Sequence, residues 1–337
     1  MTQSRLRVVW GTIGCLATTS VAAQEDARLA VRVDSARHEV ILTVGPFELS
    51  SMKGHEGHRD MPEFSARFPW PVTAMARGFS FALHDSTGKK VPQRVLHHLN
   101  LINTTRRQLL LPLQEKVMAI GRETKNIMLP GTVGLPLEAG TRMKVAIMWH
   151  NQTPVDFSGV MLTLHIRYTP DNLVPRPVTV LPISMDLADR PGAENSFPVP
   201  VGLFTISREF MMPVTGRLLA ATGHMHDWAT GLRLEDAASR KTLVSITPIL
   251  DSTGGISDMP LRLFGVRGDG LKLHGGRRYR LVATYDNRSG ATMDGMAMLG
   301  GIFSPSDLRD WPDRESEDIA YLDHPVPAPA ADTTHAH

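Results

Sequence analysis

Five of the fourteen histidines lie where several imidazoles could reach the same metal ion. The clearest pattern is the run Gly223-His224-Met225-His226, which lies in the second half of the chain. Residues i and i+2 of a β-strand point to the same face, so His224 and His226 can share one ion. Two imidazoles leave coordination positions open, which suits a reactive metal better than a closed structural site. The simpler interpretation, two half-exposed strand histidines, stays open at this point.

Adjacent histidines form the second pattern, in the run Leu96-His97-His98-Leu99. On a regular strand, adjacent side chains face opposite sides, so ligation of one ion by both requires a local distortion such as a β-bulge. His150, at the end of the strand-like run 145–150, is the candidate for a third imidazole. Without the distortion, the pair would supply one core residue and one surface residue.

The composition narrows the choice of metal. The 337 residues include seventeen methionines and a single cysteine, so no intramolecular disulfide and no thiolate-built zinc or iron–sulfur site can form. Imidazole and thioether ligands together favour copper. With 36 Lys+Arg against 34 Asp+Glu and a formal net charge of +2, the chain gives no electrostatic reason to bind nucleic acid.

The elements that must position these residues are predicted to be strands. Apolar and polar residues alternate with period two in segments bounded by Gly, Pro, Asp or Asn, namely 29–33, 160–168, 232–234 and 278–285. The proline-rich stretch Tyr168–Pro177 separates two strand-rich halves of similar size, without an obvious sequence repeat, and is the predicted domain junction. The sequence therefore predicts an all-β chain with two domains.

Both ends of the chain are predicted to lie outside these domains. Two arginines precede the short apolar run 8–17, and small residues follow up to Ala23, which is typical of a secretory signal over 1–23. The run is shorter than the roughly 20 residues of a membrane span. We therefore expect a secreted or periplasmic protein without a stable membrane span, with lipid anchoring at Cys15 as a minor alternative. Residues 307–337 are polar, then rich in Pro, Ala and His, which predicts a solvated tail.

In order and spacing, these segments resemble the copper type II, ascorbate-dependent monooxygenases, the family of peptidylglycine α-hydroxylating and dopamine β-monooxygenases. The resemblance covers roughly residues 80–305, and a chain without disulfides looks like a bacterial-type member. The His97-His98 pair and its apolar strand are similar to the family's first-copper motif, and MWHNQTPVDFSGV (148–160) resembles the segment with that copper's third histidine. GHMHDWATGLRL (223–234) resembles the His-Thr-His segment, and TYDNRSGATMDGM (284–296) the stretch that ends in an acidic-x-Met ligand.

The resemblance implies two consecutive antiparallel, jelly-roll-like β-sandwich domains, 24–172 and 173–306. Each would carry one copper ion, and the two ions would face each other across solvent. The copper that stores and delivers an electron would be held by His97, His98 and His150. The copper that activates O2 would be held by His224, His226 and Met296. Met298 is the fallback for the thioether ligand, because it lies on the same strand face.

The activity implied by the resemblance is that of a copper-dependent monooxygenase. Such an enzyme hydroxylates a C–H bond of a small organic substrate, with O2 and an ascorbate-like reductant as partners. The alternative is a non-catalytic, extracytoplasmic copper-binding or copper-handling protein on the same fold. Separate soft and three-histidine ligand sets favour catalysis, because a carrier usually needs one site only.

Two positions depart from the peptide-hydroxylating members of the family. Where those place an arginine and a tyrosine for the substrate carboxylate, this chain has Thr222 and Gly300. We therefore expect a neutral or apolar substrate rather than a glycine-extended peptide, unless Arg217 or Arg233 reaches the site from a neighbouring strand. Asp227 is left either as an acceptor for an imidazole N–H or as a strand-end residue.

Overall fold

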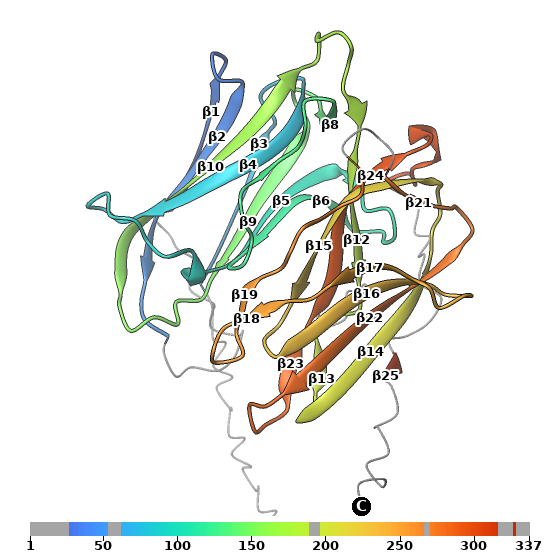
Figure 1. Ribbon diagram of the computed structural model, residues 1–337. Helices are drawn as coiled ribbons and strands as arrows, with labels where there is room; N and C mark the ends of the chain where they lie inside the picture. Colours follow the sequence, from blue (N-terminus) through green and yellow to red (C-terminus); the bar gives the residue numbers. More distant parts are fainter. Residues whose placement is uncertain (1–26, 53–61, 189–195, 266–269, 316–325, 328–337) are drawn as a thin grey trace, which may run out of the picture.

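The computed structural model describes residues 27–52, 62–188, 196–265, 270–315 and 326–327. In this part of the chain every regular element is a strand, apart from two short 3₁₀ turns, Gln93–Val95 and Leu308–Asp310. The strands build two β-sandwiches that lie side by side (Figure 1), so the predicted all-β, two-sandwich fold is confirmed. The predicted secretory signal and Cys15 lie outside the described residues.

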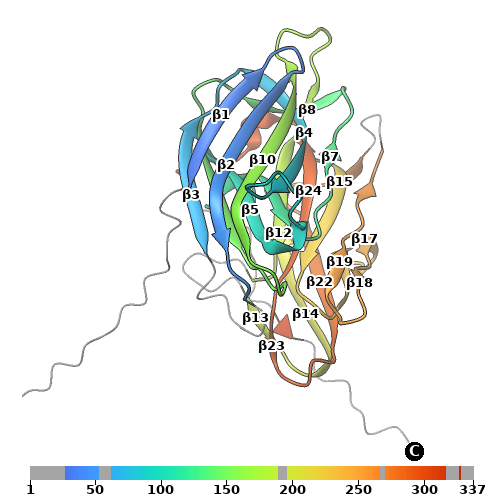
Figure 2. The ribbon, with the colours of Figure 1, turned by 90° about the vertical axis from the view of Figure 1, so that its left-hand side faces the viewer.

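The first sandwich is made of two sheets. One contains, in spatial order, β1 (Arg28–Asp34), β2 (Glu39–Leu49), β10 (Phe157–Pro170), β4 (Ala74–His84), β8 (Val133–Leu137) and β11 (Val178–Thr179), with β7 (Ile127–Met128) beside β4. The other contains β3 (Glu63–Pro69), β9 (Arg142–Trp149), β5 (Leu96–Arg107) and β6 (Gln114–Gly121). The sheet of β1, β2 and β10 is the outer one, turned away from the second sandwich (Figures 1 and 2).

The second sandwich also has two main sheets. The sheet nearer the first sandwich contains β12 (Leu181–Asp186), β24 (Ala297–Pro305), β15 (Gly216–Met225) and β20 (Arg262–Leu263), with β21 (Leu271–Leu273) beside β15. The other contains β17 (Thr242–Ile246), β16 (Ala229–Asp236), β22 (Arg278–Asn287), β14 (Gly202–Met211) and β25 (Val326–Pro327). Two separate two-stranded ribbons complete this half of the chain, namely β13 (Phe197–Val199) with β23 (Met293–Gly295) and β18 (Ile249–Leu250) with β19 (Ile256–Asp258).

Each sandwich has its own hydrophobic core, built from the alternating positions that predict the strands. In β10, Val160, Leu162, Leu164 and Ile166 are fully buried, while the residues between them are not. Burying one such side chain stabilises the fold by about 1.5–3 kcal/mol. None of the helical segments in the described ranges is long and apolar enough to cross a membrane.

The two sandwiches pack directly against each other. Leu109 and Leu110 follow β5 of the first sandwich, yet they belong to the core cluster of the second. Trp311 donates a hydrogen bond from its indole Nε1 to the carbonyl of Arg107 at 3.1 Å. A small third cluster of Val133, Val180 and Leu219 lies between the two larger cores.

The structure corrects both predicted boundaries of the second domain. Val178 and Thr179 of β11 still pair with β8 of the first sandwich, so that sandwich extends beyond residue 172. At the other end, Trp311 is buried in the second core, and β25 pairs with Ile206 and Ser207 of β14. The predicted tail from 307 is therefore partly folded. The polar composition of this segment gave no sign of the buried Trp311 or of the short strand β25, because both find their partners only in the folded sandwich.

Candidate metal centre

The two C-terminal histidines share one face of the backbone, with His224 in β15 and His226 directly after the strand ends at Met225. Thr222, His224 and His226 are half-buried, whereas the alternating Ala221 and Met225 are buried in the second core. The histidine face of this strand therefore points out of its own sandwich. The regular alternation predicted from the His-Met-His run is confirmed.

The candidate methionines lie on the neighbouring strand. β24 pairs with β15 in antiparallel register, with Met298 opposite His224. The N–H of His226 donates to the carbonyl of Met296 at 3.2 Å, just before β24 begins, and the hydroxyl of Tyr285 donates to the same carbonyl at 2.6 Å. Both methionines are half-buried and alternate with buried Ala297, so they share the face of the two histidines. The choice of Met296 over Met298 stays a prediction.

The three N-terminal histidines, His97, His98 and His150, come together through a distortion of β5. The register of β5 against β9 shifts between Leu96 and His98, which is a local distortion of the kind that ligation of one ion by both histidines requires. The imidazoles of His97 and His98 are stacked, with ring centres 4.1 Å apart. His150 follows β9, donates its backbone N–H to Val95 at 2.9 Å, and has its ring 6.0 Å from that of His97.

The N-terminal and C-terminal histidines form one continuous cluster between the sandwiches, which we call the histidine cluster. The ring centres of His98 and His224 are 5.2 Å apart, and those of His224 and His226 are 5.9 Å apart. The expectation of two ligand sets that face each other across solvent is therefore wrong for this structure. The reason is the direct packing of the sandwiches, which leaves the facing imidazoles in contact.

Ring spacing and donor chemistry allow a test of whether a metal fits. Two imidazoles that bind one ion at about 2.0 Å have ring centres no more than roughly 6 Å apart, and each successive pair in the cluster meets this limit. Among the described residues, no three His, Cys, Asp or Glu side chains are already arranged around one point. Ligation of an ion by three imidazoles therefore requires their side chains to rotate.

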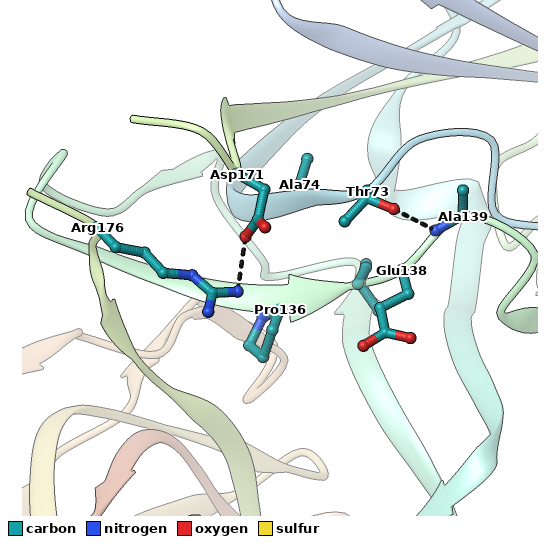
Figure 3. Close-up of a pocket in the computed structure, with 8 residues that line it drawn as sticks. Thr73, Ala74, Pro136, Glu138, Ala139, Asp171 and Arg176 are labelled. Atoms are coloured by element: carbon teal, nitrogen blue, oxygen red, sulfur yellow. Dashed lines mark hydrogen bonds and ion pairs between the residues drawn. The ribbon is translucent and has the colours of Figure 1, made fainter. Parts of the chain in front are cut away.

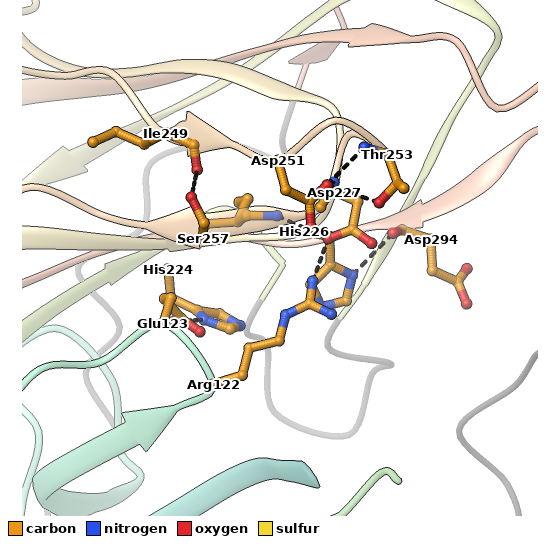
Figure 4. Close-up of polar contacts among 12 residues, drawn as sticks. Arg122, Glu123, His224, His226, Asp227, Ile249, Asp251, Thr253, Ser257 and Asp294 are labelled. Carbon is orange, nitrogen blue, oxygen red and sulfur yellow. Dashed lines mark hydrogen bonds and ion pairs between the residues drawn. The ribbon is translucent and has the colours of Figure 1, made fainter. Parts of the chain in front are cut away.

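Hydrogen bonds hold the C-terminal histidines by their Nδ1 atoms (Figure 4). The Nδ1 of His224 lies 2.7 Å from Oε1 of Glu123, and the Nδ1 of His226 lies 2.9 Å from the carbonyl oxygen of Asp294. An acceptor at Nδ1 places the proton there and leaves the lone pair on Nε2. The Nε2 of His224 is buried and makes no hydrogen bond. This is the arrangement of metal-binding histidines, so these residues fit a metal ion.

The local electrostatics keep one imidazole neutral and one carboxylate charged. Burial lowers the pKa of His98 to about 3, and the nearby His224 and His226 act in the same direction. Burial raises the pKa of Glu123, but the hydrogen bond and charge of His224 outweigh it, so this pKa ends below its ordinary value. At neutral pH, His98 therefore has a lone pair available, and Glu123 is an ionised acceptor.

The structure decides the role left open for Asp227. Its carboxylate pairs with Arg122 of the first sandwich and accepts the backbone N–H of Ile256 at 3.3 Å (Figure 4). Asp227 therefore ties the sandwiches together, and Glu123 is the carboxylate that contacts an imidazole. In the sequence, Glu123 lies at no regular spacing from a histidine, so no pattern indicated its contact with His224.

Neither of the two arginines that are near in sequence, Arg217 and Arg233, reaches Thr222. Arg233 lies on β16 in the opposite sheet, where it pairs with Glu235 at 3.3 Å. Arg217 is exposed and five residues along β15, about 17 Å away at the usual rise per strand residue. The hydroxyl of Thr222 donates to the carbonyl of Met259 at 3.0 Å.

Similar loops position the two ligand sets. The buried amide of Asn151, next to His150, donates to the carbonyls of Leu49 and Val155, and its oxygen accepts the N–H and hydroxyl of Thr153. Asn287, the last residue of β22, plays the same part. It donates to the carbonyls of Val199, Pro200 and Ala291, and accepts both groups of Ser289. The loop from Asn287 leads into the methionine segment.

One pocket lies on the first sandwich, apart from the candidate ligands (Figure 3). It is lined by Thr73, Ala74, Pro136, Leu137, Glu138, Ala139, Asp171 and Arg176. Asp171 and Arg176 form an ion pair across it at 2.6 Å. None of its lining residues is a predicted ligand, so it has no role in the proposed metal chemistry.

Comparison with known proteins finds distant structural similarities only. The chain matches no protein-family model and no curated protein sequence. Solved structures similar to it include the major capsid protein P2 from bacteriophage PM2, with a TM-score of 0.36 and 10% identity over 80% of this chain and 98% of that chain. PNGase F, a glycosylasparaginase from Flavobacterium meningosepticum, gives a TM-score of 0.37 and 11% identity over 86% and 99%. At these values, the similarities carry no argument about function.

Proposed function

We propose that this protein is a secreted or periplasmic copper-dependent monooxygenase, with two copper ions per chain. It would hydroxylate a C–H bond of a small organic substrate, using O2 and an ascorbate-like reductant. The observation that carries the proposal is the histidine cluster, in which five imidazoles from two sandwiches meet beside two half-buried methionines.

The two ligand sets differ in chemistry as the proposed roles require. A thioether with two imidazoles favours Cu(I), which suits His224, His226 and Met296 to the O2-activating ion. Three imidazoles, those of His97, His98 and His150, suit the ion that stores an electron. Copper would supply one-electron chemistry with O2. The chain supplies the Nδ1 acceptors that orient the C-terminal imidazoles, and the contact between His98 and His224 gives the electron a short path.

The surroundings of the C-terminal histidines favour a neutral substrate. Thr222 and Gly300 lie opposite each other on β15 and β24 and offer no charge. Arg122 lies beside His226 (Figure 4), and its guanidinium is already paired with Asp227. A substrate carboxylate would have to break that ion pair, and charge-assisted hydrogen bonds are worth about 1.5–3 kcal/mol each.

The test combines metal analysis with oxygen uptake. The chain from Gln24 should bind close to two copper ions after loading and desalting. His224→Ala should reduce this to about one, whereas His165→Ala, which alters a histidine paired with Glu39 far from the cluster, should leave two. With ascorbate, the loaded wild-type protein should consume O2 faster with a neutral aromatic or aliphatic substrate than with an acyl-glycine. A stoichiometry near one, or zinc preferred in both sites, contradicts the proposal.

The second candidate is a copper-binding protein without catalytic activity. It is favoured by one observation, that the imidazoles adjoin one another in a single cluster rather than in two separated sets. Such a protein would bind the two ions but would consume no O2 with ascorbate and substrate beyond the rate of free copper at the same concentration.

A further inference from the structure

We infer that Glu123, a residue of the first sandwich, is a positioning residue for the metal ligand His224 of the second sandwich. Copper binding by the C-terminal histidines would then depend on the docking of the two sandwiches. The inference rests on the proposed copper site and concerns how that site is assembled.

The first observation is the contact itself. Oε1 of Glu123 lies 2.7 Å from Nδ1 of His224, across the boundary between the sandwiches (Figure 4). The side chains of both residues are largely buried. A carboxylate at Nδ1 fixes the tautomer and the orientation of the ring, which aims the buried Nε2 of His224 into the cluster. On an isolated second sandwich, His224 would lack this acceptor.

The second observation is a rigid turn that presents Glu123. At the last residue of β6, the N–H of Gly121 donates to the hydroxyl of Thr124 at 2.9 Å, and the N–H of Thr124 donates back to the Gly121 carbonyl at 3.2 Å. The side-chain amide of Gln93 donates to the carbonyls of Gly121 and Thr124 at 3.0 and 2.7 Å. These bonds fix the backbone on either side of Glu123.

The third observation is the position of Gly121 beneath the carboxylate. A Cβ atom at residue 121 would lie 2.7 Å from Oε2 and 2.9 Å from Oε1 of Glu123. The side chain of Glu123 therefore folds back over the glycine on its way to His224. Any larger residue at 121 would push the carboxylate away from the imidazole without removing it.

The same turn offers a matched control. Lys125 forms an ion pair with Asp258 of the second sandwich, so it also crosses the boundary, but its partner is a carboxylate rather than an imidazole. Its loss should weaken docking about as much as the loss of any exposed ion pair. A purely structural role of Glu123 would therefore make Glu123→Ala and Lys125→Ala similar in their effect on copper.

The experiment measures copper affinity and the copper spectrum in the His150→Ala background, where the C-terminal copper remains. Glu123→Ala should weaken that copper about 10–100-fold in a competition titration, the usual effect of losing such an acceptor. Glu123→Gln should recover part of the loss, because its amide oxygen still accepts from Nδ1. Lys125→Ala should change the affinity little. The EPR parameters of the Cu(II) form should shift in Glu123→Ala and stay unchanged in Lys125→Ala.

One further variant keeps the result unambiguous. Gly121→Ala retains every charged group, and it should weaken the same copper if the position of the carboxylate matters, even where Glu123→Ala folds poorly. Equal effects of Glu123→Ala and Lys125→Ala, or unchanged affinity and EPR parameters in all variants of a chain that binds copper, would overturn the inference. If the wild-type chain binds no copper at all, the proposed function is wrong as well. If it binds copper but the variants do not differ as expected, only the inference about Glu123 is wrong.

Discussion

The C-terminal histidines follow the regular alternation at the end of one strand, whereas the N-terminal histidines depend on a register shift in theirs. His224 in β15 and His226 just after it share a face through simple alternation. His97 and His98 are adjacent in sequence, and the shift between Leu96 and His98 brings their rings together. The same outcome, imidazoles gathered at the sandwich boundary, is reached by two backbone geometries.

The two groups also differ in what holds their rings. His224 and His226 each have an acceptor at Nδ1, one of them from the opposite sandwich. His97 and His98 stack on each other. Hydrogen bonds fix a tautomer and an angle, whereas stacking fixes mainly a distance. We therefore expect the C-terminal site to have the more specific geometry and to be the more sensitive to single substitutions.

The largest expected effect concerns the methionine that only the C-terminal site has. Met296→Ile should retain the N-terminal copper but abolish O2-dependent turnover, because the soft ligand that favours Cu(I) is gone. X-ray absorption of the reduced protein should show a Cu–S contribution that disappears in this variant. If the sulfur signal remains in Met296→Ile and is lost in Met298→Ile instead, the assignment moves to Met298 and the contrast between the sites remains.

The next effect tests the similarity of the two loops. Asn151→Ala and Asn287→Ala should each lower the free energy of unfolding by about 3 kcal/mol, because each leaves buried carbonyls without donors. Asn151→Ala should lower the occupancy of the copper beside His150, and Asn287→Ala that of the copper on the methionine side. Denaturant unfolding and metal analysis measure both effects. Gln152→Ala, at an exposed neighbour, is the control, and a loss as large there would contradict the explanation.

The smallest expected effect concerns the response of the first sandwich to acid. Burial raises the pKa of Glu39, but the hydrogen bonds and charges of His165 and Arg167 together lower it by more. The pKa of Glu39 therefore ends below its ordinary value of 4.5. A carboxyl whose pKa is lowered by folding stabilises the fold at any pH above its pKa in the unfolded chain. This contribution is lost as the pH falls through its pKa in the folded chain. Glu39→Gln should therefore cost about 1 kcal/mol at neutral pH, where the partly exposed partners are screened, and nothing in strong acid.

The comparison of Glu39→Gln with the wild type is made by denaturant unfolding at several pH values. The difference in unfolding free energy should shrink steadily below the ordinary carboxyl pKa. A difference that is constant with pH would show that packing, rather than charge, is responsible.

Much of the fold was predictable because strand periodicity is a local property. The alternation in 160–168 and in 278–285 was visible in the sequence and corresponds to β10 and β22. The His-Met-His run was equally local, which is why the face of β15 could be predicted. The bulge at His97 could only be stated as a condition for joint ligation, because a register shift depends on the partner strand.

The features that escaped prediction all depend on the packing of one sandwich against the other. Leu109 and Leu110 look like ordinary core residues of the first sandwich but are buried in the second. Glu123 contacts His224 across 101 positions of sequence, and no pattern in one sequence encodes such a distance. The contact between His98 and His224 likewise follows from the docking of the sheets.

The asparagine turns have a consequence for producing this protein. Asn151-Gln152-Thr153 and Asn287-Arg288-Ser289 both match the Asn-x-Ser/Thr acceptor for N-linked sugars. The Nδ2 atoms of Asn151 and Asn287 are buried and donate to several carbonyls, and a glycan, which replaces one of the two hydrogens, would remove at least one of those bonds and require a buried side chain to carry a sugar. A secretory host that attaches sugars before the chain folds would therefore block both loops that position the ligand sets, whereas a bacterial periplasm without that modification would leave them free to close.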